Sequence, residues 1–343
     1  MQEEEENLEF DSKVECEEEE LEKTLRKPNL GKPTLKDPIK NLPSLDLDGI
    51  VSYIKNGHAK NIIILQGAGI SCAAGIPDFR SPGTGLYDNL KQYNLPYPER
   101  IFEVNFVRET PEPFFQVAKN QLPGLYKPTL AHHLPVLLEK HGLLTRVYTQ
   151  NIDGLEKAAG LSSDLVVEAH GSFDTGTCFE CRKKYQLKEF YDTISKGEVS
   201  RCPSCNGVIK PNVVLFGEDL PIKFQTYRKK DFKKCDLLIV IGSSLKVSPF
   251  CDSIALAHRN VPRLLLNKEI VATYDEVLRR TTDPCGNSVV YEKSKGKGLF
   301  KFGHKLNQRD VFYGGDCQET VKELIIKLGW ERELQDIYNP DNI

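Results

Sequence analysis

The chain lacks the features that mark membrane, secreted and nucleic-acid-binding proteins. No apolar run approaches the ~20 residues that a membrane-spanning helix needs. The N-terminus has no basic stretch followed by an apolar one, and its acidity is the opposite of a mitochondrial transit peptide. The formal net charge of -3 provides no basic excess for binding DNA or RNA. We therefore expect a cytoplasmic protein, with access to the nucleus, that binds neither membranes nor nucleic acid.

The composition otherwise indicates a globular chain with one acidic end. Of the 343 residues, 39% are hydrophobic and 28% are charged, and the length suits one large domain with a smaller companion. Glutamates cluster at 3–6 and 17–20, and a proline-rich stretch follows. Such a segment cannot bury enough apolar surface to fold. We predict a disordered acidic tail and linker over 1–44, a folded domain over 45–330, and a C-terminal tail over 331–343.

Short apolar runs alternate with helical stretches, a pattern that favours an α/β fold around a parallel sheet. The runs are rich in branched residues, as expected for strands buried on both faces. The predicted strands are 61–65, 145–149, 165–168, 236–241 and 263–266. An amphipathic helix is predicted over 318–328, and Gly329 is placed to end it. The pattern predicts a Rossmann-type sheet with helices on both faces.

Small, polar and titratable residues follow these strands in place of generic turn residues. The segments are 66–69 (QGAG), 150–153 (QNID), 170–171 (HG), 242–244 (GSS) and 267–269 (NKE). Ligands of open parallel sheets bind outside the carboxyl ends of the strands. We therefore place the functional site at this edge of the sheet.

Gly67 and Gly69 form a G-x-G turn between the first strong strand and a predicted helix. In that position backbone amides and a helix N-terminus can bind a pyrophosphate, although tight turns alone also explain the glycines. Cys72 replaces the third glycine of the dehydrogenase fingerprint, and no acidic residue closes a second strand at the ~20-residue offset. The segment 76–82 contains two prolines, which a continuous helix does not tolerate. The turn predicts a dinucleotide site that does not perform ordinary hydride transfer.

Four of the ten cysteines form two C-x-x-C pairs, and the other six are scattered. The pairs are Cys178 with Cys181 and Cys202 with Cys205. Twenty residues separate the two pairs, close to the ~15–20 of zinc ribbons. Four thiolates leave no coordination position for water, so the metal would be structural; a redox dithiol or disulfides are the weaker alternatives. We predict a zinc module over 173–211, inserted between His170 and the strand-like run 213–216.

Taken together, the motifs resemble the sirtuin family. In chain order they are GAGIS (67–71), GIPDFRSPGTGLY (75–87), TQNIDGLE (149–156), HGS (170–172), the cysteine pairs, FGE (216–218), GSSL (242–245) and NKE (267–269). The resemblance covers the folded domain and is greatest for class I members, in particular the cytosolic branch that acts on tubulin and histones. It implies a Rossmann core over about 45–85, 126–172 and 212–330, with a helical insertion over about 86–125 that joins the zinc module in a small domain.

The resemblance implies an NAD-dependent protein-lysine deacetylase that consumes NAD and releases nicotinamide, O-acetyl-ADP-ribose and free lysine. The sequence leaves its oligomeric state open, and we favour a monomer. Acetylated proteins such as histones or tubulin would be its substrates. His170 would be the general base, because an imidazole titrates near neutral pH; alone, a histidine at a strand end is more often structural. Asn151 would order a catalytic water, and Gln150 would hold the ribose. Asp153 would accept from the nicotinamide carboxamide, although on its own it also suits a helix cap.

The implied NAD-binding residues lie in the glycine turn and in the segments that follow the other strands. They are Gly67, Ala68, Gly69, Ser71, Ile76, Asp78, Phe79, Arg80, Gln150, Asn151, Ile152, Asp153, Gly242, Ser243, Ser244, Asn267, Lys268 and Cys317. Arg80 would lie near the phosphates.

An acetyl-lysine peptide would lie as an added strand between two loops, bound mainly through its backbone. The implied substrate-binding residues are Phe79, His170, Val214, Phe216, Gly217, Glu218, Ser244, Leu245, Lys246 and Val247. Members that remove succinyl groups carry a tyrosine and an arginine in the acyl pocket, and this chain lacks that pair in the expected place. We therefore expect neutral acyl groups as substrates.

The residues leave three functions open: a deacylase, a mono-ADP-ribosyltransferase that uses the same activated ribose, and a non-catalytic reader of NAD or acyl-lysine. Dependence on acylated lysine separates the first two, and a reader needs no base such as His170. Two local features also stay open. Cys72 is either a reactive thiol near a helix N-terminus or a small buried side chain. The basic segment 293–301 is predicted to be a surface loop.

Overall fold

The computed structural model describes residues 42–78, 86, 90–93, 95–273 and 299–338. The predicted acidic tail up to residue 41, the segment 293–298, and residues 339–343 lie outside this part of the chain. No helix in the described part is long and apolar enough to cross a membrane.

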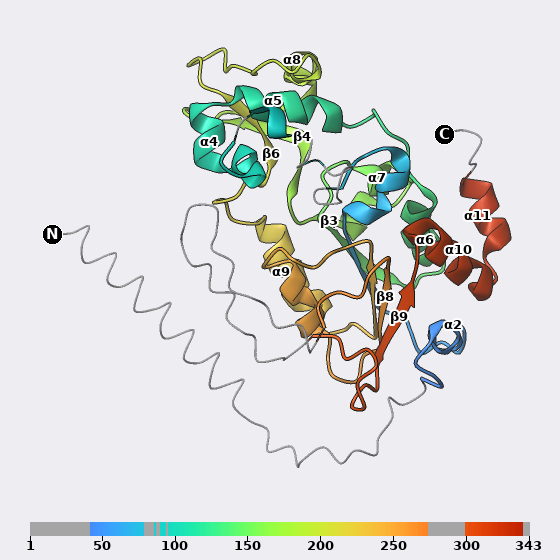
Figure 1. Cartoon of the computed structure of the whole chain (residues 1–343). Coiled ribbons are helices and arrows are strands. Elements are labelled where there is room, and N and C mark those ends of the chain that lie inside the picture. The colour runs from blue at the N-terminus through green and yellow to red at the C-terminus, as the bar shows by residue number, and fades with distance from the viewer. Residues whose placement is uncertain (1–41, 79–85, 87–89, 94, 274–298, 339–343) are drawn as a thin grey trace, which may run out of the picture. The chain divides into compact units, whose positions relative to one another are not determined.

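Six parallel strands form the larger sheet in the order β3-β2-β1-β7-β8-β9 (Figure 1). Their bounds are Ile62–Gln66 (β1), Leu144–Thr149 (β2), Val166–Glu168 (β3), Leu237–Ile241 (β7), Arg263–Asn267 (β8) and Asp310–Gly314 (β9). Every residue of β1 and of β7 is buried, because both faces of the sheet are covered. The five predicted strands are confirmed, and β9 is a sixth that the apolar runs did not reveal.

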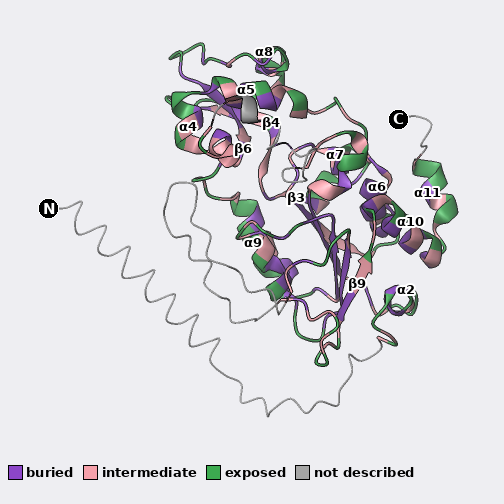
Figure 2. Ribbon diagram, viewed as in Figure 1, coloured by how far each residue is buried: buried purple, intermediate pink, exposed green. Residues whose placement is uncertain are grey.

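Helices cover both faces of this sheet, as predicted. On one face the apolar sides of α2 (Leu47–Lys55), α6 (Leu130–Lys140) and α10 (Cys317–Leu328) pack against β1. On the other face lie α9 (Ile222–Asp231) and the 3₁₀ helix η8 (Cys251–Leu256). Figure 2 shows the strands buried and the outer sides of the helices exposed. Further α-helices are α4 (Val104–Glu109), α5 (Glu112–Ala118), α7 (Leu155–Ala158), α8 (Tyr191–Ser195) and α11 (Glu331–Ile337).

The ends of α10 follow from its capping residues. The Asp316 carboxylate accepts a hydrogen bond from Gln318 N at 2.9 Å, and Gly329 follows the helix with a φ of 86°, a conformation that favours glycine. The predicted helix and its end are confirmed. Beyond them the predicted C-terminal tail is wrong for residues 331–337, which form α11. Leu334 of α11 is buried with the core of the larger sheet, so burial of apolar surface holds this helix in place.

A three-stranded antiparallel sheet forms the smaller part of the structure, in the order β5-β4-β6. Its strands are β4 (Gly171–Cys178), β5 (Lys184–Gln186) and β6 (Ile209–Val213). Apolar residues of α4, α5 and this sheet share one core, so the helical insertion and the cysteine module pack as one unit. The strand-like run predicted over 213–216 is wrong beyond Val213. The chain turns there, because Glu218 N donates to Leu215 O and Gly217 adopts a φ of 91°.

A buried ion pair joins the two last strands of the larger sheet. Arg263 Nε lies 2.6 Å from Asp310 Oδ1, and Arg263 Nη2 lies 2.8 Å from Oδ2. Both side chains are 1% exposed. Such a bidentate pair is strong only while both charges are present, because either charge alone is buried without compensation.

We expect Asp310→Asn to lower the free energy of unfolding by about 3–5 kcal/mol, because it leaves the Arg263 guanidinium buried beside a neutral amide. Urea denaturation of the zinc-loaded protein at pH 7 measures the loss. Asp48→Asn, which breaks the surface pair with Lys327, is the matched control and should leave the midpoint almost unchanged. Equal, small effects of both substitutions would contradict the prediction.

Candidate active site

The carboxyl ends of the parallel strands meet at one edge of the larger sheet. In the strand register Gln66 of β1 pairs with Thr149 of β2 and with Ile241 of β7. Gly242 N, just after β7, donates to Leu266 O of β8 at 3.1 Å. The loops that carry the predicted site residues therefore leave the sheet side by side.

The glycine turn packs directly on the loop after β7. Gly67 N donates to Ile241 O at 3.1 Å, and Gly69 N donates to Gly242 O at 2.9 Å. A Cβ atom at Gly67 would lie 2.8 Å from Gly242 O, and one at Gly69 would lie 2.8 Å from Gly242 Cα. Neither distance is tolerated, so the glycines are required for this close approach of two backbones.

This packing removes two amides from the predicted phosphate cradle. The amides of Gly67 and Gly69 already donate within the protein, so they are not available to a pyrophosphate. The predicted helix is also wrong: only two 3₁₀ turns follow, η1 (Ala68–Ile70) and η2 (Cys72–Ala74). Gly75, with a φ of 93°, and Pro77 prevent an α-helix from continuing.

Ser71, Asn151 and Asp153 form a buried hydrogen-bonded cluster next to the glycine turn. Ser71 Oγ donates to Asp153 Oδ2 at 2.8 Å. Asn151 Nδ2 donates to Ser71 Oγ at 3.1 Å and to Gly67 O at 3.2 Å. Asp153 Oδ1 accepts from Leu155 N at 3.0 Å, so the carboxylate bonds to the first amide of α7, although the N-cap residue of that helix is Gly154. Burial raises the pKa of Asp153, and its hydrogen bonds from Leu155 and Ser71 oppose that effect.

Three residues that were not predicted to belong to the site, His132, Thr129 and Gln318, support Ser71 and the neighbouring Ile70. His132 Nε2 lies 3.4 Å from Ser71 Oγ, and His132 Nδ1 accepts from Thr129 N at 3.1 Å. Desolvation lowers the pKa of His132 to about 3, so the ring is neutral. Thr129 Oγ1 and Gln318 Nε2 both donate to Ile70 O. The available signal was the T-x-x-H capping box at the start of α6.

His170 lies beside the Gln150–Asp153 turn, as predicted. Its Nδ1 atom is 3.0 Å from Gln150 O, and because a carbonyl oxygen only accepts, Nδ1 carries the hydrogen and Nε2 keeps its lone pair. Burial lowers the pKa of His170, and the bond to Gln150 partly opposes this. Ser243 Oγ donates to Gln150 Oε1 at 2.7 Å, which ties the loop after β7 to the same turn. The imidazole is therefore a neutral acceptor at pH 7.

Three of the predicted NAD-binding residues, Asn267, Lys268 and Cys317, lie together at the ends of β8 and β9. Gly315 N donates to Asn267 O at 3.1 Å, and Lys268 Nζ lies 3.6 Å from Asp316. Cys317 begins α10 and is buried, which raises the pKa of its thiol to about 12. This end of the edge is separated from His170 by the loops after β1 and β7.

One predicted peptide loop, residues 216–218, is bonded to the chain at Phe102 and Val104. Phe216, 44% exposed, donates its N–H to Phe102 O at 2.8 Å and accepts at O from Val104 N at 3.0 Å. Glu218 Oε2 accepts from Leu215 N at 2.8 Å and from Lys210 Nζ at 2.7 Å. The Glu218 side chain is therefore used to hold this loop.

Not every predicted side chain is accessible. Leu245 is buried in the core, so it can meet a peptide only through its backbone. Ser244 and Lys246 are exposed, whereas Ala68, Ile76, Asp78, Ile152, Val214 and Val247 are partly buried. Val214 N donates to His170 O at 2.7 Å, which joins that loop to the imidazole residue. Phe79 and Arg80 lie outside the residues that the structure describes.

Neither interpretation of Cys72 holds. The residue is exposed, so it is not a buried apolar side chain. Desolvation of the thiol and the negative charge of Asp78 raise its pKa, so no stabilised thiolate forms either. The absence of an α-helix after Gly69 removes the helix N-terminus that was expected to lower this pKa.

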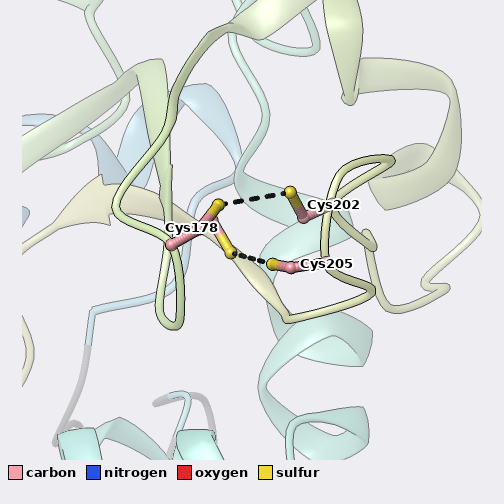
Figure 3. A group of neighbouring side chains, drawn as sticks. Cys178, Cys202 and Cys205 are labelled. Carbon is pink, nitrogen blue, oxygen red and sulfur yellow. Dashed lines mark hydrogen bonds between the residues drawn. The ribbon is translucent and has the colours of Figure 1, made fainter.

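The four paired cysteines form one cluster, as predicted (Figure 3). All four sulfur atoms lie within 4.8 Å of one another. Cys178 Sγ is 3.5 Å from Cys205 Sγ, and Cys181 Sγ is 3.6 Å from Cys202 Sγ. These distances greatly exceed the ~2.05 Å of a disulfide and approach the spacing of four sulfurs at about 2.3 Å from one ion. Tyr185 donates to Cys202 Sγ and lowers its pKa to about 6, which favours the ligating thiolate. The donor set fits a tetrahedral zinc ion.

Comparison with known proteins agrees with this arrangement. The model of the Sir2 family matches residues 67–249. The NAD-dependent protein deacetylase sirtuin-2 of Danio rerio is 43% identical over 306 residues, which are 87% of this chain and 76% of the relative. The NAD-dependent protein deacetylase sirtuin-3 of Mus musculus is 40% identical over 85% of this chain and 78% of the relative. The NAD-dependent deacetylase sir2A of Dictyostelium discoideum is 45% identical, but this chain covers only 53% of it.

We expect one zinc ion per chain by elemental analysis, and we expect Cys202→Ala to abolish its retention because three thiolates cannot close the site. Loss of the ion should also open residues 173–211 to limited proteolysis, since their core is small. Cys251→Ala, outside the cluster, is the matched control and should retain the metal. Full zinc occupancy in the Cys202 variant would count against a four-thiolate site.

Proposed function

The chain belongs to the Sir2 family, in its sirtuin-2-like branch, and we propose that it is an NAD-dependent protein-lysine deacetylase. The observation that carries the proposal is the neutral His170 imidazole bonded to the turn that contains Asn151 and Asp153. A general base, an amide and a carboxylate thereby meet at the ligand-binding edge of a parallel sheet.

We assign the two halves of NAD to the two ends of this edge. The nicotinamide ribose would meet Gln150 and Asn151, with Asp153 accepting from the carboxamide. The adenosine half would meet Ser243, Asn267, Lys268 and Cys317. Because the amides of Gly67 and Gly69 are engaged, the diphosphate would depend on other donors, and Arg80 remains our candidate for the neutralising charge. When bound, NAD supplies the ADP-ribose that accepts the acetyl group.

His170 acts on a ribose hydroxyl through Nε2, the nitrogen that carries the lone pair. The imidazolium that forms is stabilised by the Nδ1–H bond to Gln150 O, because that bond strengthens when the ring becomes positive. Both donors of the Asn151 amide are engaged with Gly67 and Ser71. Its carbonyl oxygen is left to accept from a water, which suits the proposed ordering role.

The substrate would be an acetylated protein whose lysine segment pairs with the loops of Phe216–Glu218 and Ser244–Val247. Backbone pairing reads little sequence, so we propose broad peptide specificity. Val214 and Phe216, which would line the acyl pocket, are apolar, and this favours a neutral acyl group.

We expect nicotinamide release from NAD to require an acetylated peptide, and His170→Ala to reduce the rate on the order of 10²- to 10⁴-fold because the base is lost. The assay compares acetylated and unacetylated peptides with the zinc-loaded protein. His258→Ala, which removes an exposed imidazole, is the control and should retain the rate. Release that ignores acetylation would favour an ADP-ribosyltransferase, and no release would favour a reader.

On the acid side of the pH–rate profile, the pH at which the rate falls to half should lie below the ordinary pKa of histidine. Because burial lowers the pKa of His170, the imidazole stays neutral and basic as the pH falls through ~6.5, and the rate declines only at lower pH. Measuring kcat between pH 5 and 8, with zinc content checked at each point, tests this. An acid limb at or above ~6.5 would show that His170 does not set it.

A further inference from the structure

Three buried polar atoms without a hydrogen-bond partner in the described structure belong to Gln66 and Glu156. They are the two amide atoms of Gln66 and Glu156 Oε1. Gln66 is 0% exposed and Glu156 is 1% exposed. Buried polar groups in folded proteins are almost always bonded, so these orphaned atoms call for an explanation.

Thr149 lies between these two residues. Gln66 pairs with Thr149 in the strand register, and both continue the alternation that places Ile64 and Val147 on the same face of the sheet. The Thr149 hydroxyl is close enough to the Glu156 carboxyl group to oppose, in part, the rise in its pKa. Thr149 Oγ1 in turn accepts from Asn151 N at 3.1 Å. Glu156 is thus connected through one side chain to the turn that holds the proposed catalytic residues.

The surroundings of Glu156 disfavour a negative charge. Asp153 lies three residues earlier and Glu168 lies on the neighbouring strand β3, and both repel a carboxylate. Lys157, the cation of the same helix, is engaged at 2.8 Å by Glu168 and at 2.7 Å by Asp174. On α6, which packs on α7, desolvation lowers the pKa values of His132 and His133, so they supply no positive charge. Burial and these repulsions raise the pKa of Glu156 to about 8.

We propose that Glu156 is a neutral positioning residue of the active site, with Gln66 as its partner. One carboxyl oxygen accepts from Thr149, and the protonated Oε1 donates to Gln66 Oε1, which needs a donor. Asp153 then remains the ionised carboxylate of the pair and keeps its bonds to Ser71 and Leu155. Ionisation of Glu156 at alkaline pH places a second negative charge beside Asp153 and disturbs the turn. The effect on NAD rests on the proposed function, whereas the protonation state does not.

The first experiment measures protonation without any activity. A carboxyl group whose pKa is raised in the folded state stays protonated there while its unfolded counterpart has lost the proton. The wild-type protein therefore loses stability between the unfolded value of about 4.5 and the folded value of about 8, and Glu156→Gln does not. The measured quantity is the unfolding equilibrium constant of the wild type divided by that of the variant. Between pH 6 and pH 8 this ratio should rise by up to about tenfold per pH unit, and above pH 8 it should become constant.

Urea denaturation of zinc-loaded protein supplies these constants, and Glu109→Gln, at an exposed site, is the matched control with a flat ratio. A flat ratio for Glu156→Gln as well would overturn the proposal. The same ratio is then measured with Gln66→Leu present in both proteins. It should become constant at a lower pH, because the acceptor that stabilises the neutral Glu156 carboxyl group is gone. If the ratio becomes constant at the same pH with and without Gln66→Leu, Gln66 is not the partner of Glu156.

The second experiment follows the KM for NAD against pH. For the wild type, KM should rise above pH 8, while Glu156→Gln should show no rise and retain most of its kcat at pH 7. Glu156→Ala, which loses the proposed bond to Thr149, should be impaired at every pH. The same alkaline rise in Glu156→Gln would refute the positioning role. If the wild type and all variants show no turnover, but the ratio of unfolding constants depends on pH as expected, only the proposed function is refuted.

Discussion

The contact of Gly67 and Gly69 with Gly242 is the constraint on which the site depends. Two backbones approach so closely there that a single Cβ atom at either glycine of the turn would force β1 and β7 apart. The same contact leaves Gly67 O to accept from Asn151 and brings Ser243 to Gln150. The turn after β2 is therefore positioned by loops from its neighbours, and the glycines serve packing before they serve any ligand.

Desolvation sets the charges of this site. His132 and His170 are both neutral at pH 7 because burial disfavours their charged forms. Burial raises the pKa of Asp153, and donors from Ser71 and Leu155 partly oppose that effect. Few full charges are thus present where a cationic nicotinamide ring would be cleaved, and each of the buried groups has a defined donor or acceptor role.

The smaller sheet connects the cysteine cluster to the proposed base. β4 begins at Gly171, directly after His170, and ends at Cys178, so one strand joins the imidazole to a zinc ligand. β6 pairs with β4 and leads into the loop of Phe216, which is bonded in turn to the chain at Phe102 and Val104. A structural ion that stabilises these strands therefore also stabilises the walls of the proposed peptide site, although it takes no part in the chemistry.

The sequence by itself determined the parallel sheet, the zinc ligands and the segments that line the site. Apolar runs buried on both faces identify β1, β2 and β7, and the two cysteine pairs identify the cluster through spacing alone, because both signals are local. Residues such as Asn151 and His170 could be recognised because they follow strands in known motifs.

Only the tertiary structure decided which groups meet across the chain. The engagement of the Gly67 and Gly69 amides, the support of Ser71 by His132, and the position of Gln66 beside Thr149 all depend on strands that are distant in sequence. The pKa values of Glu156 and Cys72 likewise follow from burial and neighbouring charges. Local patterns encode which elements form; desolvation and long-range hydrogen bonds arise only after those elements have packed.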